Sequence, residues 1–188
     1  MKLRGTAETL IGIDVVDFEV SEPKLILSNC SVSNMNRIAT GSIDIAYSRS
    51  VMEHVDNVDA AYSEIHRVLR PGGKYLFLTP NFWDYVSLIS CVIPNRLHGK
   101  LVKFAEGRPE SETFPVYYRS NTHYRINKLS RKHKLRVVDF KYFGQYPSAL
   151  LFSDALFRAG STYEKLLERY RYLHFLRGWI LCILSKTE

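Results

Sequence analysis

Polar side chains follow the apolar segment 43–48, with Ser48 and Arg49 at its end and His54 a few residues further along. A guanidinium such as that of Arg49 can bind a carboxylate or a phosphate through two parallel hydrogen bonds. An imidazole such as that of His54 titrates near neutral pH and can serve there as a general base. The alternatives are an arginine exposed on the surface and a histidine held by structural hydrogen bonds.

Short apolar runs and turn residues predict the elements that position these side chains. Strands are expected at Leu10–Val16, Lys24–Ser28, Ile43–Ser48 and Lys74–Thr79, and a helix at Asp56–Arg70, where apolar residues recur at helical spacing. Strands that alternate with helices are typical of a parallel sheet, which binds ligands at the carboxyl ends of its strands. Ser48 and Arg49 would lie at that edge.

The rest of the chain continues this alternation. Helices are predicted at Asp84–Ile93 and Thr122–His133, strands at Leu135–Phe143 and Gly178–Ser185, and between these strands a helical stretch, Ser148–Leu173, broken near Gly160. We expect a single domain over residues 1–188, with an insertion at about 84–118. The glycines of Pro71-Gly72-Gly73 are predicted to form a turn, because a phosphate-binding loop runs from strand to helix and this segment runs from helix to strand.

The segment Ser42–Asn81 carries a specific combination of motifs. It contains, in order, the strand S-I-D-I-A-Y-S, the segment V-M-E-H-V, a helix ending R-V-L-R-P-G-G and a strand ending T-P-N. In this order and at these spacings the chain resembles the type 11 family of class I methyltransferases, which use S-adenosylmethionine (SAM). The resemblance extends over about residues 8–95 and, in element order only, over about 115–185. It implies an α/β, Rossmann-like sheet of parallel strands with a C-terminal antiparallel hairpin.

The resemblance implies SAM as the cofactor, with Asp14 at its ribose and Val15 among the cofactor-binding residues. Asp14, followed by Val15, ends the first predicted strand, where an acidic residue of the family accepts hydrogen bonds from both ribose hydroxyls. Asp17 could substitute for Asp14. The alternative for Asp14 is an aspartate of a solvent-exposed turn.

Further cofactor contacts are implied after the next two strands. The family has an acidic residue at the adenine amino group, whereas the stretch 29–34 offers Ser33 and other neutral acceptors, which form weaker bonds. Ser48 and Arg49 would line the methionine end of the cofactor. The chain therefore departs from the family at the position that would bind the adenine amino group.

The acceptor of the methyl group has no fixed signature, because transfer to a good nucleophile needs mainly proximity and orientation. His54 would be needed as a base only for a weak nucleophile. Asn81, Tyr118 and Arg119 are predicted to contact the substrate. The aromatic and basic composition around Arg119 favours a small-molecule, glycan or lipid-linked acceptor, anionic ones included, although most cations of 119–141 would also suit a solvated helix face.

The opening strand of the family and its D-x-G-x-G-x-G loop are absent from these 188 residues. In the family this strand lies between those that correspond to Leu10–Val16 and Ile43–Ser48. Without it, two central strands expose unpaired edges or pair with each other. Three explanations stay open: a misassigned start codon, a truncated gene, or a partner chain that supplies the strand.

Composition bounds the partners and the compartment. The net charge of +7 is equally consistent with an anionic partner, such as a phosphorylated substrate or a membrane surface, and with simple solubility. No nucleic-acid-binding motif accompanies this charge. Cys30, Cys91 and Cys182 lack metal-ligand spacing, so we expect no metal and a reducing cytoplasm. No apolar run reaches the ~20 residues of a membrane span, while peripheral membrane contact stays open.

Two functions from different classes are therefore expected. The first is SAM-dependent methyl transfer, favoured by Asp14 and by the segment S-R-S-V-M-E-H-V. The second is a non-catalytic methyltransferase-like remnant or interaction module, favoured by the missing glycine loop. A nicotinamide-dependent oxidoreductase is disfavoured by the order of the R-V-L-R-P-G-G and T-P-N motifs.

Overall fold

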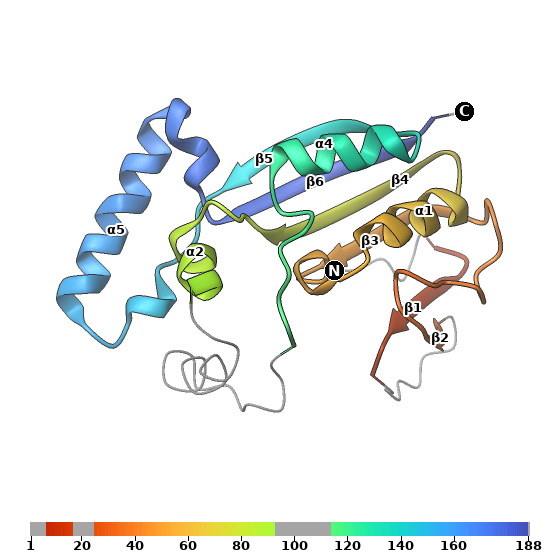
Figure 1. Ribbon diagram of the computed structural model, residues 1–188, viewed down its shortest axis with the longest axis horizontal. Helices are drawn as coiled ribbons and strands as arrows, with labels where there is room; N and C mark the ends of the chain where they lie inside the picture. Colours follow the sequence, from red (N-terminus) through yellow and green to blue (C-terminus); the bar gives the residue numbers. More distant parts are fainter. Residues whose placement is uncertain (1–6, 17–24, 93–113, 188) are drawn as a thin grey trace.

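The computed structural model describes residues 7–16, 25–92 and 114–187. Its strands are β1 (Leu10–Asp14), β2 (Leu25–Asn29), β3 (Ile43–Arg49), β4 (Leu69–Pro80), β5 (Leu135–Phe143) and β6 (Trp179–Lys186). Its helices are α1 (Val58–Val68), α2 (Tyr85–Val92), α4 (His123–Lys132) and α5 (Asp154–Arg169), with short 3-10 turns η1 (Met52–His54), η3 (Ser148–Leu150) and η4 (Arg171–Leu176). This order confirms the predicted alternation (Figure 1). Much of the predicted insertion, residues 93–113, lies outside the described residues.

The described strands form two sheets, one of β1 and β2 and one in the order β3-β4-β6-β5. β1 and β2 are parallel, as are β3 and β4, whereas β6 is antiparallel to both of its neighbours. The predicted C-terminal antiparallel pair is therefore confirmed. Within the described ranges, no strand lies between β1 and β3, so each has an edge without a strand neighbour.

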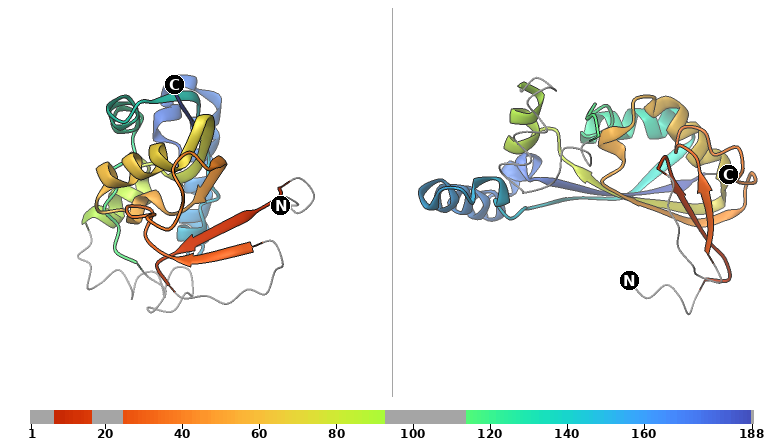
Figure 2. Two further views of the ribbon diagram at one scale, coloured as in Figure 1. Left: turned by 90° about the vertical axis from the view of Figure 1, so that its right-hand side faces the viewer. Right: turned by 90° about the horizontal axis from the view of Figure 1, so that it is seen from below.

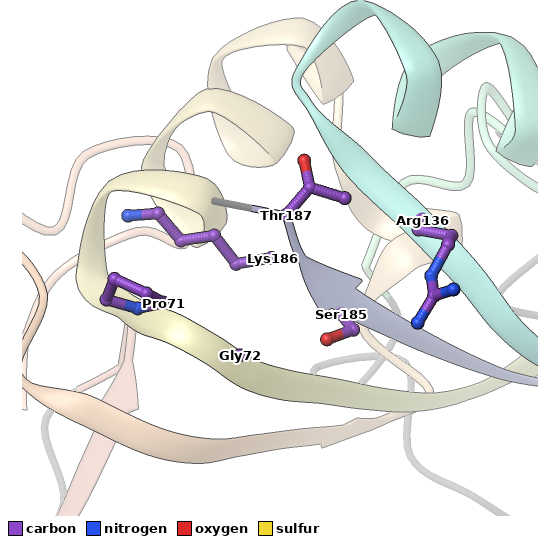
Figure 3. A pocket seen from close by; sticks show the side chains of 6 residues that line it. All are labelled: Pro71, Gly72, Arg136, Ser185, Lys186 and Thr187. Carbon is purple, nitrogen blue, oxygen red and sulfur yellow. The ribbon is translucent and has the colours of Figure 1, made fainter.

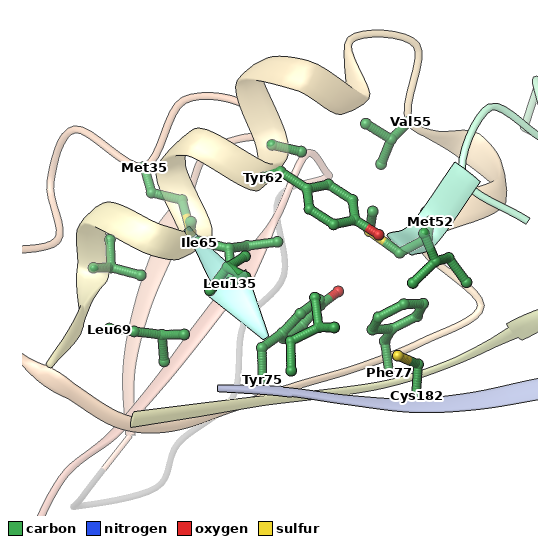
Figure 4. Packing of buried hydrophobic residues seen from close by; sticks show 14 of the residues in the cluster. Met35, Met52, Val55, Tyr62, Ile65, Leu69, Tyr75, Phe77, Leu135 and Cys182 are labelled. Atoms are coloured by element: carbon green, nitrogen blue, oxygen red, sulfur yellow. The ribbon is translucent and has the colours of Figure 1, made fainter. Parts of the chain in front are cut away.

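The hydrophobic core lies on one face of the four-stranded sheet. Helices α1 and α4 both cover this face (Figures 1 and 2). Tyr75 and Phe77 of β4 point toward α1, and so does Cys182 of β6 (Figure 4). Tyr62 and Ile65 of α1 meet them from above, and all five side chains are buried. This layer fixes the positions at which β3 and β4 end.

A charged pair on α1 fastens the loop that follows β2. Arg67 donates to both carboxylate oxygens of Glu64, at 2.7 and 2.9 Å, and to the backbone carbonyls of Ile38 and Met35, at 2.8 and 2.7 Å. Glu64 also accepts a hydrogen bond from the Met35 amide at 2.7 Å. The loop is thus held along α1 rather than free in solvent.

We expect Arg67→Met to lower the free energy of unfolding by about 1–3 kcal/mol, because charge-assisted bonds to two loop carbonyls are lost. The matched control is Arg70→Met, which removes an ion pair to Asp44 whose side chains are 60% and 64% exposed. Such an exposed pair contributes only ~0.2–1 kcal/mol. Urea unfolding of both variants compares the two losses, and equal losses would contradict this role of Arg67.

Two predictions made at glycines are wrong. Helix α1 ends at Val68 instead of Arg70, and the predicted Pro-Gly-Gly turn lies inside β4, where Gly72 has φ +74°. Helix α5 runs through Gly160 without the predicted break. A Cβ at Gly160 would lie 2.8 Å from Cδ1 of Leu150, so this glycine permits close packing of η3 against the helix.

Candidate functional site

The carboxyl ends of β3 and β4 lie side by side, at Arg49 and Pro80. Because β6 is antiparallel to β4 and β5 is antiparallel to β6, the end of β5 and the start of β6 share this edge, at Phe143 and Trp179. Loops at the carboxyl ends of parallel strands form the ligand sites of open α/β sheets. The candidate site therefore lies along this edge of the sheet.

Asp14 ends β1 with an exposed carboxylate. Its Oδ1 accepts a hydrogen bond from the Val16 amide at 3.1 Å, and its backbone carbonyl accepts one from the Cys30 amide at 2.9 Å. Among the described residues its second carboxylate oxygen has no partner. Val15 beside it is 59% exposed. The position after β1 thus presents a carboxylate that can accept bonds from an outside donor.

Ser33 lies in the loop after β2 and links this loop to the start of α1. Its hydroxyl donates to the backbone carbonyl of Asn57 at 3.2 Å, and its amide donates to Oγ of Ser31 at 3.2 Å. Asn57 in turn caps α1 by accepting from the Ala60 amide at 3.0 Å. These bonds bring the segment after β2 beside the segment after β3.

Ser48 and Arg49 end β3 with different surroundings. Oγ of Ser48 lies 2.6 Å from the Tyr75 hydroxyl, and burial raises the pKa of Tyr75 above its ordinary value. Arg49 is exposed, and within the described ranges it has no ion-pair partner. Ser50 adopts φ +53°, and its amide donates to the Leu78 carbonyl, so the chain turns sharply out of the sheet here. Arg49 is therefore the available cation at the end of β3.

Turn η1 places His54 next to a buried carboxylate that the sequence analysis did not single out. Nδ1 of His54 lies 2.8 Å from the Pro115 carbonyl, which can only accept, so Nδ1 carries the proton of the neutral ring. Nε2 is then the basic nitrogen, 3.9 Å from Oε1 of Glu53. Nε2 of His54 therefore faces the carboxylate of Glu53.

Glu53 is 4% exposed and belongs to a chain of polar side chains. Its Oε2 accepts from Thr79 at 2.9 Å, and the Asn121 amide donates to Oγ1 of Thr79 at 2.8 Å. Burial raises the pKa of Glu53, which its hydrogen bonds and the charge of His54 oppose. The sequence signal that could have identified Glu53 is a lone carboxylate in a short segment that also holds the apolar residues Met52 and Val55. Both of these residues are buried.

The three predicted substrate residues are buried or contact other residues of this chain. Asn81 is fully buried, and its side-chain amide donates to the carbonyls of Phe175 and Arg177 at 2.6 and 2.8 Å. Arg119 lies 2.7 Å from the Asp56 carboxylate, with its guanidinium over the Tyr117 ring. Tyr118 is 8% exposed. Their predicted contact with a substrate stays a prediction.

An open depression of about 450 Å³ lies at the opposite end of the sheet (Figure 3). It is lined by Pro71, Gly72, Arg136, Ser185, Lys186 and Thr187. These residues stand where β4 and β5 begin and β6 ends, far along the strands from Arg49 and Pro80. The depression is therefore separate from the candidate site.

Solved structures of known proteins share this fold. The cyclase SpnF aligns with a TM-score of 0.58 at 14% identity, over 98% of this chain and 68% of that chain. A SAM-dependent methyltransferase from Mesorhizobium loti aligns with a TM-score of 0.55 at 15% identity, over 96% of this chain and 81% of that chain. A chain of the Haloferax volcanii complex that contains the methyltransferase activator Trm112 aligns with a TM-score of 0.56 at 16% identity, over 96% of this chain and 72% of that chain. Because one of these proteins is a cyclase, the fold alone does not define the reaction.

A family model described as a methyltransferase domain matches residues 3–77. Two uncharacterised proteins of Mycobacterium tuberculosis, from the CDC 1551 and H37Rv strains, are 35% identical to the chain over 69 residues. The match covers 37% of this chain and 22% of each relative, so the chain spans less than a quarter of their length. The methyltransferase-domain match includes Asp14, Ser33, Ser48, Arg49 and His54.

Glu53 gives the stability of the chain a testable pH dependence. Since its pKa is raised on folding, the folded chain binds more protons than the unfolded chain from about pH 4.5, the ordinary value, up to the raised value. Stability should therefore fall as pH rises through this window, and Glu53→Gln should remove that part of the fall. Thermal unfolding followed by circular dichroism at closely spaced pH values measures the difference.

The control for Glu53→Gln is Glu64→Gln, for which the opposite sign is expected. Arg67 lowers the pKa of Glu64, so this carboxylate stabilises the fold above its unfolded value and the contribution is lost as pH falls through the lowered value. Glu64→Gln should thus be destabilised at neutral pH. Parallel pH profiles of Glu53→Gln and the unsubstituted chain would contradict the raised pKa of Glu53.

Proposed function

We propose that the chain contributes the SAM site of a methyltransferase, with the cofactor lying over the carboxyl ends of β1, β2 and β3. The observation that carries this proposal is a pair of hydrogen bonds that joins the segments after β1, β2 and β3. The Cys30 amide binds the Asp14 carbonyl, and the Ser33 hydroxyl binds the Asn57 carbonyl. Three loops with polar side chains thereby lie together within a segment that matches the methyltransferase domain family.

The residues present fit two parts of SAM. The Asp14 carboxylate oxygen that has no partner among the described residues is an acceptor for ribose hydroxyls, and the exposed guanidinium of Arg49 is a donor for the carboxylate of the methionine moiety. SAM supplies an electrophilic methyl group on a positively charged sulfur. The protein then has to hold an acceptor atom in line with that methyl group.

His54 is proposed as the group that takes a proton from a weakly nucleophilic acceptor. Its Nδ1–H bond to the Pro115 carbonyl fixes the ring, and Glu53 lies behind Nε2. The His54 side chain is 31% exposed, so Nε2 can reach a substrate at the edge of the site. An acceptor that is already a good nucleophile would not need this step.

The proposed acceptor is a small molecule, a glycan or a lipid-linked compound, anionic ones included. The net charge of +7 supports an anionic acceptor. Exposed aromatic side chains near the site, Trp83, Phe114 and Tyr117, support one with apolar or sugar surfaces. Within the described residues, no helix is long and apolar enough to cross a bilayer. Methylation of protein or nucleic acid alone, in an acceptor screen with labelled SAM, would exclude this acceptor class.

Calorimetric titration with SAM and S-adenosylhomocysteine tests the cofactor site. We expect Asp14→Ala to weaken binding by about 10- to 100-fold, because charge-assisted hydrogen bonds contribute about 1.5–3 kcal/mol. Asp44→Ala is the matched control, since Asp44 is an exposed carboxylate at the opposite end of β3. Equal affinity of both variants would exclude Asp14 as the ribose acceptor.

A second candidate function is a non-catalytic interaction module. The observation that favours it is the pair of strand edges, on β1 and β3, that lack a strand neighbour within the described chain. A folded chain that binds neither SAM nor S-adenosylhomocysteine in the calorimetric titration would support this function over methyl transfer.

A further inference from the structure

Helix α5 stands apart from the layered part of the molecule. It lies beyond the end of the four-stranded sheet, away from α1 and α4 (Figures 1 and 2). Its buried side carries Gly160 and Leu167, and the side chains of Leu150 and Pro147 lie against Gly160. Because β5 leads into this segment and β6 follows it, α5 extends from the carboxyl edge of the sheet.

Hydrogen bonds fix which side of α5 faces the rest of the chain. The Gln145 amide donates to Oε2 of Glu164 at 3.2 Å, and the Gln145 side chain donates to Oδ1 of the buried Asp84 at 2.9 Å. Glu164 and Gly160 are about one helical turn apart, so they share one side of the helix. The other side of α5 consequently points outward from the sheet edge.

The outward side of α5 combines cations with apolar side chains. Its residues recur three or four positions apart, which places them on one side of a helix with about 3.6 residues per turn. We call these exposed residues the outer face: Ala155, Arg158, Ala159, Lys165, Leu166 and Arg169. Leu166 is 46% exposed, and Leu156, at the border of this face, is 45% exposed. The acids of α5, Asp154, Glu164 and Glu168, lie at other positions of the helix.

The cations of the outer face are available to an anionic partner. Arg158 and Lys165 form no ion pair within the residues that the structure describes, and the guanidinium of Arg169 lies 5.7 Å from the centroid of the Tyr170 ring. Long basic side chains can lay their apolar stems along a greasy surface while the charge stays in water. Leucines beside such cations are typical of helices that lie in the plane of a membrane interface.

Helix α4 is also basic but lacks this pattern. It exposes Lys128 and Arg131, whereas Tyr124 is the single exposed large apolar side chain among its residues, all of which are described. Around α5, exposed apolar side chains continue with Leu151 before the helix and Tyr172 after it. An anionic lipid surface attracts the cations and also accommodates the leucines, whereas nucleic acid offers phosphates without an apolar phase. The outer face therefore favours lipid.

We propose that α5 docks the chain on the surface of an anionic lipid bilayer. Leu156 and Leu166 enter the boundary between headgroups and acyl chains, and Arg158 and Lys165 bind the headgroup phosphates. Because α5 extends from the carboxyl edge of the sheet, docking brings the candidate site near the lipid surface. Among the proposed acceptors this favours a lipid-linked compound. That choice of acceptor rests on the proposed function, whereas the docking rests on the outer face alone.

Cosedimentation of the whole chain with lipid vesicles tests the docking. The anionic vesicles contain equal parts of phosphatidylcholine and phosphatidylglycerol, and vesicles of phosphatidylcholine alone are the comparison. Each Lys or Arg at an anionic surface strengthens binding about fivefold, so binding to the anionic vesicles should be about tenfold tighter or more. High salt should weaken it, because salt screens exposed charges. Anionic vesicles should also slow amide hydrogen exchange in α5 and leave exchange in α4 unchanged.

Substitutions separate the outer face from the net charge of the chain. Arg158→Gln combined with Lys165→Gln should weaken binding to the anionic vesicles about 25-fold, and Leu166→Gln alone should weaken it about tenfold. The matched control is Lys128→Gln combined with Arg131→Gln, which removes the same charge from exposed positions of α4 and should leave binding nearly unchanged. All of these positions are exposed, so the melting temperatures should stay the same. Equal binding of the two double variants, or full binding of Leu166→Gln, would overturn the proposal.

Further outcomes separate this proposal from its rivals and from the proposed function. Equal binding to the two kinds of vesicle would contradict docking through the cations. So would binding of a double-stranded DNA oligonucleotide in place of vesicles. All of these measurements are made without SAM. Vesicle binding by a chain that binds neither SAM nor S-adenosylhomocysteine would support the docking and contradict the cofactor site, and SAM binding without vesicle binding would do the reverse.

Discussion

Replacing Tyr62 by alanine is expected to lower the free energy of unfolding by about 3–5 kcal/mol, the usual cost of truncating a buried aromatic side chain. Tyr62 is fully buried between α1 and the sheet, and its hydroxyl lies 3.0 Å from Oγ of Ser120. Truncation therefore leaves a cavity beneath α1 and removes a buried hydrogen bond. Urea unfolding followed by circular dichroism measures the loss.

Two control variants separate the contributions of Tyr62. Tyr62→Phe keeps the ring and removes the hydroxyl, so a loss of about 1 kcal/mol is expected. Tyr172→Ala removes a tyrosine that is 73% exposed and should change stability little. If Tyr62→Ala were no more destabilising than Tyr172→Ala, the core that supports the ends of β3 and β4 would be wrongly placed.

Asn81→Ala should lower the free energy of unfolding by about 2–4 kcal/mol, because two carbonyls lose their donors in a buried region. These carbonyls belong to Phe175 and Arg177, at the entrance to β6. Chemical denaturation again gives the measurement. The bonds join the carboxyl end of β4 to the C-terminal part of the chain.

The control for Asn81→Ala is Asn127→Ala, since Asn127 is partly exposed and donates to the carbonyl of His123 one helical turn earlier. A loss below about 1 kcal/mol is expected there. An Asn81 that only contacted a substrate would behave like Asn127 in this measurement. Unchanged stability of Asn81→Ala would contradict this structural role of Asn81.

Local pattern was sufficient to predict the strands and most helices. The β-branched runs of β1 and β3 and the helical spacing of Val58, Ala61, Ile65 and Val68 depend on near neighbours in sequence, and the structure has each element within two residues of its predicted bounds. The family motifs predicted the parallel order and the C-terminal antiparallel pair in the same way.

The features that sequence reasoning missed depend on contacts between distant parts of the chain. Asn81 binds carbonyls 94 and 96 residues away, and a T-P-N motif gives no sign of those partners. Glu53 becomes buried because Thr79 and the segment at Asn121 close over it. A helix break was predicted near Gly160, a residue of low helix propensity, whereas α5 runs through it and the missing Cβ leaves room for the Leu150 side chain.

Hydrogen–deuterium exchange of the chain with and without S-adenosylhomocysteine locates the cofactor site directly. We predict slower exchange of backbone amides in residues 14–16, 30–33 and 49–51, at the carboxyl ends of β1, β2 and β3, with unchanged exchange around Arg136 and Lys186. Protection around Arg136 and Lys186 instead, or no protection at any of the three strand ends, would contradict a cofactor site at this edge.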